Sequence, residues 1–274
     1  MLSSFQLKKK KKMNQVDILK WFFVSGIDES VSETPINHFQ SRFNQTPQRV
    51  SSITTVAPAP VSSACVEDSF VAQAQQSASL AMNLSQLRQA LDNFDGCSLK
   101  KTAAHTLDGI GIDEQPDVLC VIDSPKTADE KFGKLGSGDS GILLSKMLKA
   151  IQLDWLHNTY VAPLIPWRLP GDRKPTETEV AVCLPFLKRR IALLKPRFIL
   201  IFGSLATKAL LDIDSVPKAR QQLLHYSTEQ GNIPVIVTFG PDMVVKGQSY
   251  RTNAWADLQK LQQMILEQKE NKNA

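Results

Sequence analysis

A segment near the C-terminus has the pattern of a strand that ends in a functional turn. Residues 234–246 read PVIVTFGPDMVVK, apolar and β-branched until the chain turns at Gly240 and Pro241. Strands that end in this way often present a reactive side chain at the turn, but here the position holds glycine. The turn is therefore either an active site served by other residues or the remnant of one.

Acidic side chains follow an earlier apolar segment. The stretch IDSPKTADEKFGKLGSGDSG, residues 122–141, contains Asp123 and then the adjacent carboxylates of Asp129 and Glu130. Carboxylates at the end of a buried strand are candidates for acid–base chemistry. The alternative is that Asp129 and Glu130 form only a solvated pair on a loop.

Basic side chains gather in the loop WRLPGDRKP, which contains Arg168, Arg173 and Lys174. Together with Lys246, these residues are candidate contacts to the phosphates of DNA. The arginines could instead tie the loop to the sheet. The 4 histidines are scattered and show no spacing typical of a metal site or a catalytic triad.

The elements that position these residues alternate between strand and helix. Apolar runs predict strands at 117–123, 159–166, 197–203 and 234–240. Helices are predicted near 85–95, 140–151, 176–194 and 252–268, with Ser85 as an N-cap and Thr176 with Glu179 as a capping box. Pro185 is expected to kink or split its helix, and Pro163 to make its strand bent or peripheral. This order predicts an α/β fold, a three-layer α/β/α sandwich around a four-stranded parallel sheet.

Composition suggests three regions. Residues 1–26 combine a basic tail with a short helix at 14–25, residues 27–80 have the composition of a disordered linker, and 84–270 form the folded domain. The formal charge of +5 equals the contribution of Lys8–Lys12, so the remainder is balanced. These lysines form either an arm for nucleic acid or a solvated tail. No apolar run is long enough to cross a membrane, and the 4 dispersed cysteines predict a reduced, cytoplasmic protein, which we expect to be monomeric.

Residues 165–203, IPWRLPGDRKPTETEVAVCLPFLKRRIALLKPRFILIFG, resemble the uracil-DNA glycosylase superfamily, specifically its type-4-like alphaproteobacterial branch. ILKWFFVSGIDESV, FDGCSLKKTA and TNAWADLQKL resemble other parts of that branch in the same order. The resemblance implies a base-flipping DNA repair hydrolase. Such an enzyme needs a carboxylate that activates water, a stacking aromatic ring, an Asn that reads uracil and a His that stabilises the departing base.

The resemblance also identifies which residues stand at those four positions. Asp129 replaces the water-activating Glu, in a loop that begins at Asp123. Gly136 replaces the stacking Phe, and the nearby Phe132 is expected to pack beneath the loop. Pro163 replaces the Asn, and Gly240 replaces the His.

Two residues beside these positions also depart from the family pattern. Lys126 replaces a glycine and is expected to crowd the site. Asp242 replaces a serine and is expected to repel a departing anion. The resemblance therefore implies a degenerate active site.

Type-4 enzymes hold a [4Fe–4S] cluster through four cysteines. Only Cys97 and Cys183 match, as a vestigial pair, because Phe94 and Trp167 occupy the other two positions. We therefore expect no metal or cofactor.

Three hypotheses follow. The protein is catalytically dead or impaired and at most binds DNA; or it is an active glycosylase that uses Asp129, perhaps on another base; or it is a non-enzymatic module that binds protein or ligand. Met243, which stands in the former DNA wedge, is compatible with the third.

Overall fold

The computed structural model describes residues 63–273, so the predicted tail, the helix at 14–25 and most of the predicted linker lie outside the described residues. The linker prediction was wrong for its last part, because α2 (Ser63–Leu80) is a helix. Ala74 and Ala78 lie one turn apart on α2 and are buried. Alanine has the highest helix propensity, and this small-residue face packs α2 against α7 (Glu177–Leu194).

One mixed sheet forms the centre of the molecule. Its strand order is β1-β3-β2-β4-β6-β5, and the four inner strands are parallel, as predicted. Two antiparallel edge strands were not predicted, so the sheet is six-stranded rather than four-stranded. The strands are β1 (Ile110–Gly111), β2 (Val118–Ile122), β3 (Thr159–Pro163), β4 (Phe198–Phe202), β5 (Leu224–Thr228) and β6 (Gly231–Thr238).

The expectation that Pro163 would make its strand peripheral was also wrong. β3 lies between β1 and β2, and all of its residues are buried. Pro163 is tolerated because it is the last residue of the strand and pairs only with Ile122 of β2, beyond the two-residue β1. The missing backbone donor therefore falls where no neighbour on the β1 side requires it.

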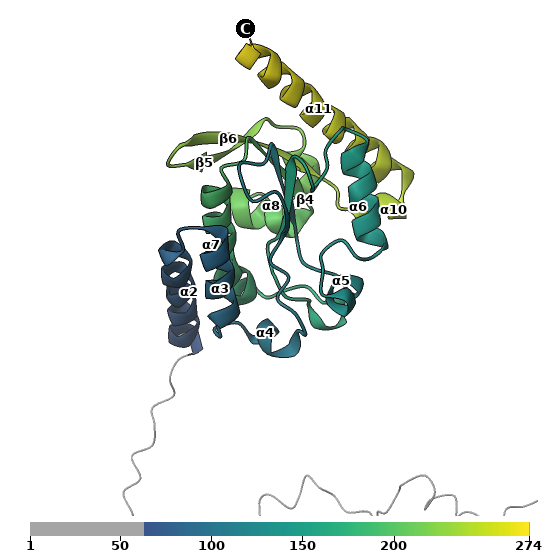
Figure 1. Ribbon diagram of the computed structural model, residues 1–274. Helices are drawn as coiled ribbons and strands as arrows, with labels where there is room; N and C mark the ends of the chain where they lie inside the picture. The colour runs from purple at the N-terminus through teal and green to yellow at the C-terminus, as the bar shows by residue number, and fades with distance from the viewer. Residues whose placement is uncertain (1–62, 274) are drawn as a thin grey trace, which may run out of the picture. The chain divides into compact units, whose positions relative to one another are not determined.

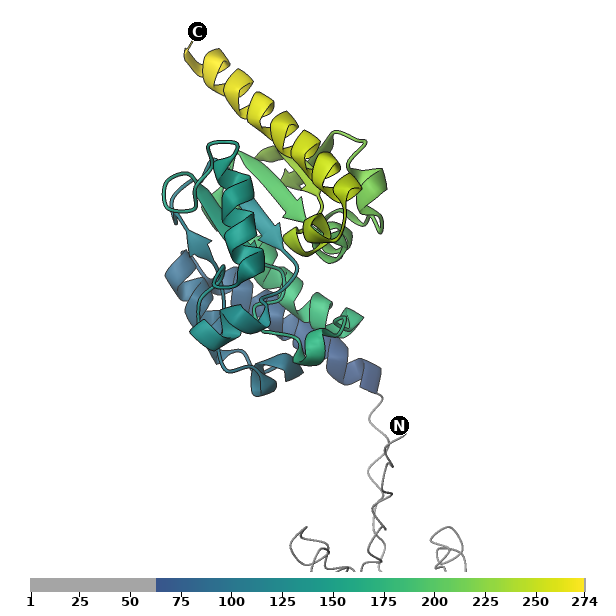
Figure 2. The same ribbon diagram turned by 90° about the vertical axis from the view of Figure 1, so that its right-hand side faces the viewer.

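Helices cover both faces of the sheet. Figure 1 shows α7 and α8 (Ser204–Leu211) on one side of β4, and α6 (Asp139–Lys149) and α10 (Pro241–Lys246) on the other. In Figure 2 the yellow helix α11 (Gln248–Asn273) and the teal helix α6 lie over the same face. The remaining short or outer helices are α3 (Leu84–Asn93), α4 (Ser98–Thr102), α5 (Thr127–Phe132), α9 (Val216–Ala219) and the 3₁₀ turn Pro170–Asp172.

The predicted helix ends are partly confirmed. Thr176 and Glu179 form the capping box of α7. The N-cap of α3 is Asn83 and not Ser85, because the Asn83 side chain accepts the Gln86 amide. α7 is not split at Pro185.

A buried ion pair joins α7 to the segment before β1. Arg190 and Asp108 are 2% and 6% exposed, and they form a salt bridge. Arg88 of α3 also approaches Asp108, at 3.4 Å. Burial, together with the nearby charge of Arg88, lowers the pKa of Arg190 to about 9, so the charged guanidinium is costly in the interior and the adjacent Asp108 supplies its counter-charge.

We predict that Asp108→Ala lowers the free energy of unfolding by about 3–5 kcal/mol, because it leaves the buried Arg190 without a counter-charge. Urea denaturation followed by circular dichroism measures the change. Asp214→Ala is the matched control, because Asp214 pairs with Lys208 at the surface, and it should leave stability almost unchanged. Equal stabilities of the two variants would contradict a structural role for the buried pair.

Candidate functional site

A cavity of about 450 Å³ lies where the inner strands end. Parallel strands deliver their following loops to one edge of a sheet, which is the usual place for a ligand. We call it the strand-end cavity. Its lining includes Asp123, Gly136, Ser140, Trp155, Gly240 and Asp242.

The structure brings together most of the residues selected from the sequence. Asp123, Asp129, Gly136 and Gly240 line the strand-end cavity, whereas Pro163 is buried at the end of β3 and is not part of the lining. Lys174 and Lys246 also line it, but Arg168 and Arg173 do not. The predicted gathering of loops is therefore observed, with two of the basic residues outside it.

Asp123 is held at the N-terminus of α8. Its Oδ1 accepts the Ala206 amide at 2.9 Å, and a side chain on Gly203 would collide with its carboxylate. Gly203 has a φ of +106°, a conformation that favours glycine. Burial raises the pKa of Asp123 to about 6, against the opposing effects of the Ala206 amide and Lys126.

Asp129 is bound by the backbone of its own loop. Its Oδ2 accepts the Lys126 amide and its Oδ1 accepts the Ser137 amide, both at 2.9 Å. The side chain is buried and caps the first turn of α5. With one backbone donor on each oxygen, this carboxylate has the geometry of a loop-fixing residue.

Lys126 and Asp242 lie on different loops and form an ion pair across the cavity. Lys126 Nζ is 2.7 Å from Asp242 Oδ2, and Ser140 donates to the other oxygen of Asp242. Burial opposes ionisation, but these two hydrogen bonds hold the pKa of Asp242 below its usual value. The sequence predicted a crowding lysine and a repelling carboxylate separately, and it missed that each neutralises the other.

An aromatic side chain occupies the space beside Gly136. A Cβ on Gly136 would lie 2.6 Å from Cη2 of Trp155, and Gly136 has a φ of +78°. Trp155 comes from the turn between α6 and β3. It was not selected from the sequence, because no motif indicates that this turn contacts Gly136. Phe132 is 65% exposed, so the expectation that it packs beneath the loop was wrong.

Gly240 differs from Gly136 because its surroundings are empty. It is the N-cap of α10 with a φ of −66°, and a Cβ there would meet nothing within 4 Å. A Cβ therefore fits at this position without strain. The two glycines thus differ in that Gly136 is packed against Trp155, whereas Gly240 borders open space.

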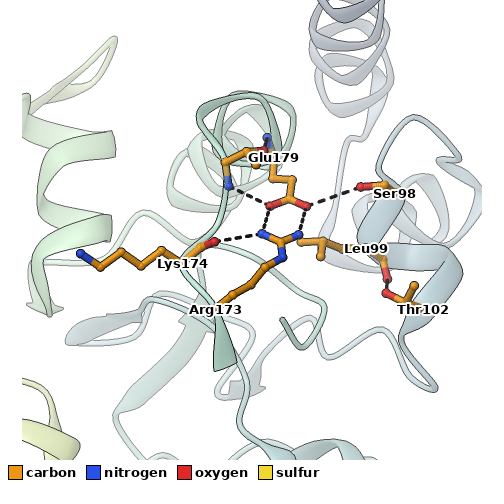
Figure 3. A network of polar contacts seen from close by, with 7 residues as sticks. Ser98, Leu99, Thr102, Arg173, Lys174 and Glu179 are labelled. Atoms are coloured by element: carbon orange, nitrogen blue, oxygen red, sulfur yellow. Dashed lines mark hydrogen bonds and ion pairs between the residues drawn. The ribbon is translucent and has the colours of Figure 1, made fainter. Parts of the chain in front are cut away.

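Two of the proposed phosphate-binding residues are engaged within the protein. Arg173 forms two hydrogen bonds with Glu179, at 2.5 and 2.9 Å, and donates to the Lys174 carbonyl (Figure 3). Arg173 holds the pKa of Glu179 below its usual value. Arg168 contacts Glu130 at 3.3 Å, so both arginines connect their loop to helices, α5 and α7, and not to the sheet that the alternative interpretation named.

Lys174 and Lys246 differ from the two arginines in that they line the strand-end cavity. Figure 3 shows the Lys174 side chain extending away from the Arg173–Glu179 pair. Both lysines line the strand-end cavity, one from the loop before α7 and one from α10. They are the cations best placed to meet a phosphate.

Comparison with known proteins establishes the family. The sequence model of the uracil DNA glycosylase superfamily matches residues 110–259, more than half of the chain. The chain belongs to the uracil-DNA glycosylase superfamily. It is similar to type-4 uracil-DNA glycosylases of Pyrobaculum aerophilum, 26% identical over 182 residues, and of Archaeoglobus fulgidus, 26% identical over 170 residues. These alignments cover 65% and 60% of this chain, and 92% and 84% of the respective relatives.

The residues present do not fit the iron–sulfur cluster of the type-4 members of this superfamily. Cys97 and Cys183 are buried and share a hydrogen bond, which lowers the pKa of Cys97 and raises that of Cys183. Phe94 packs edge-on against Phe186, and the Trp167 ring donates to Thr106 Oγ1 at 3.2 Å, so aromatic rings fill the other two positions. Two thiols cannot provide four thiolate ligands. Within residues 63–273, no group of three or more metal-binding side chains is found, and no helix is long and apolar enough to cross a membrane.

We predict that three glycine-to-alanine variants lose different amounts of stability, according to the backbone conformation and the free space at each glycine. Gly240→Ala should leave stability almost unchanged. Gly171→Ala should cost about 1 kcal/mol, because Gly171 has a φ of +63° but open space around it. Gly136→Ala should cost about 2–4 kcal/mol, because the same backbone strain is joined by the clash with Trp155. Urea denaturation measures the series, and an equal loss at 136 and 171 would show that Trp155 moves aside freely.

We predict that Asp123→Asn stabilises the protein at neutral pH. Because the pKa of Asp123 is higher in the folded than in the unfolded state, the wild-type residue contributes stability at low pH that is lost as pH rises from about 4 to about 6. The variant should match wild type near pH 4 and exceed it by about 1–2 kcal/mol above pH 6. Unfolding curves at pH 4, 5, 6 and 7.5 test this, and a difference independent of pH would refute it.

Proposed function

We propose that this uracil-DNA glycosylase superfamily protein retains a pocket for a base but has lost, or strongly reduced, the excision of uracil. The observation that supports this most directly is the composition of the strand-end cavity. Its described lining contains no histidine, asparagine or glutamine. The positions where the family resemblance places His and Asn hold Gly240, which is open, and Pro163, which is buried outside the lining.

Cleavage of the glycosidic bond leaves negative charge on the departing uracil. A single donor aimed at such charge contributes about 10²–10³ to the rate. Here Lys126 is paired with Asp242 in one neutral contact, and the nearby carboxylate of Asp123 can only accept hydrogen bonds when it is ionised. These groups do not supply the histidine donor that the family resemblance assigns to this step.

The alternatives receive less support. An active site built on Asp129 would have to release that carboxylate from the two amides that hold its loop. Met243, the basis for a non-enzymatic binding module, packs partly buried against the core. DNA contact is proposed through Lys174 and Lys246. Cytoplasmic location and a monomeric state remain predictions from the sequence.

The decisive experiment is uracil release from single- and double-stranded oligonucleotides. We expect turnover at least about 100-fold below that of an ordinary type-4 enzyme, from the loss of one donor alone. Gly240→His is the informative variant, because a Cβ at this position meets no atom within 4 Å, and it should raise any residual activity. Wild-type turnover within about tenfold of the ordinary enzyme would overturn the proposal.

A further inference from the structure

The turn that bears Trp155 is fixed by its own backbone. The Asp154 carbonyl accepts the amides of residues 157, 158 and 159, at 3.0–3.1 Å. The Asp154 carboxylate accepts the Leu156 amide, and the Asn158 side chain accepts the Asp154 amide, both at 2.8 Å. Five hydrogen bonds within this short turn hold Trp155 in a defined position before any ligand arrives.

Trp155 gives the strand-end cavity an aromatic surface. Its ring lies against Gly136, and Leu144, Val161 and Phe202 contribute apolar side chains to the same lining. A partly apolar cavity with an indole in its lining favours a flat, unsaturated ring, because stacking needs no hydrogen-bond match. This surface does not distinguish one base from another.

Discrimination between bases must come from polar groups of the lining, such as Asp123. The Ala206 amide donates to its Oδ1 and the Leu205 amide also interacts with the carboxylate, which leaves about two of its roughly four acceptor sites for a ligand. Ionised carboxylates accept hydrogen bonds and donate none, and in nucleic acids they pair with the amino group of cytosine. At the same C4 position uracil presents a carbonyl oxygen, an acceptor that a carboxylate repels, and its one donor on this edge is the N3–H between two carbonyls.

We propose that the strand-end cavity binds an amino-bearing pyrimidine of the cytosine class in preference to uracil, with Trp155 stacking on the ring and Asp123 accepting from the amino group. This inference rests on the proposed function only in treating the cavity as a base pocket. It involves binding alone and no bond cleavage. Lys174 and Lys246 at the same cavity supply contacts to the flanking phosphates.

The test uses the full-length protein and single-stranded oligothymidylates that carry one central deoxycytidine or one central deoxyuridine. Fluorescence anisotropy at pH 7.5 and about 150 mM salt gives the two dissociation constants. We expect the deoxycytidine strand to bind at least fivefold more tightly. Asp123→Asn replaces one acceptor by a donor and should bring the two affinities within about twofold.

Variants of Trp155 test the stacking surface. Trp155→Ala should weaken binding of the deoxycytidine strand about tenfold, whereas Trp155→Phe, which keeps an aromatic ring, should retain most of the affinity. Trp255→Ala is the control, because Trp255 is 43% exposed on α11, and it should bind as wild type does. Circular dichroism identifies any variant that fails to fold. Tryptophan fluorescence then tests the stacking directly: the deoxycytidine strand should change the fluorescence of the wild-type protein, and this change should be absent in Trp155→Phe.

Equal affinities for the two strands, no measurable binding of either, or an unaltered preference in Asp123→Asn would overturn the inference. The uracil-release assay is read separately. Rapid uracil release would overturn the proposed function whatever the binding preference, while slow release together with equal affinities would overturn only the cytosine preference.

Discussion

The parallel pairing of four inner strands is the constraint on which the rest of this structure depends. Because β3, β2, β4 and β6 run in one direction, the segments that follow them converge at a single edge of the sheet. Residues of β2 and β4 are buried almost throughout, and this burial holds the two strands in register. The register sets the position along the sheet at which each following loop begins. A cavity therefore persists at this edge whichever side chains the loops carry.

The ion pair of Lys126 with Asp242 shows how the altered loops remain compatible. Either residue alone would place an uncompensated charge in a partly apolar cavity. Together they form one neutral contact that spans the ends of β2 and β6, with Ser140 as a third partner. The two departures that the resemblance implies, at Lys126 and Asp242, are thus coupled in the structure, and this part of the cavity lining is an organised arrangement.

The sequence predicted the features that depend on local pattern. Apolar runs located the four parallel strands, and the Thr176–Glu179 spacing located a helix start. The resemblance located Asp123, Gly136 and Gly240, which do meet. The edge strand β1 escaped notice because it has only two residues.

Contacts between residues from different segments could not be predicted from local sequence patterns. The side chain that faces Gly136 comes from a polar turn with no periodicity. Arg173 has the loop position of a phosphate ligand, and only the three-dimensional proximity of Glu179 shows that the guanidinium is already engaged. Physical pairing of this kind is decided by the fold and leaves no mark in local composition.

The two cavity glycines differ in what a substitution would require. An aromatic side chain at position 136 would need Trp155 to move or to be replaced, because a Cβ there already lies 2.6 Å from the indole. A Cβ at position 240 meets no atom within 4 Å, so a change there calls for no second one. Redesign of this cavity would therefore take paired substitutions at one glycine and a single substitution at the other.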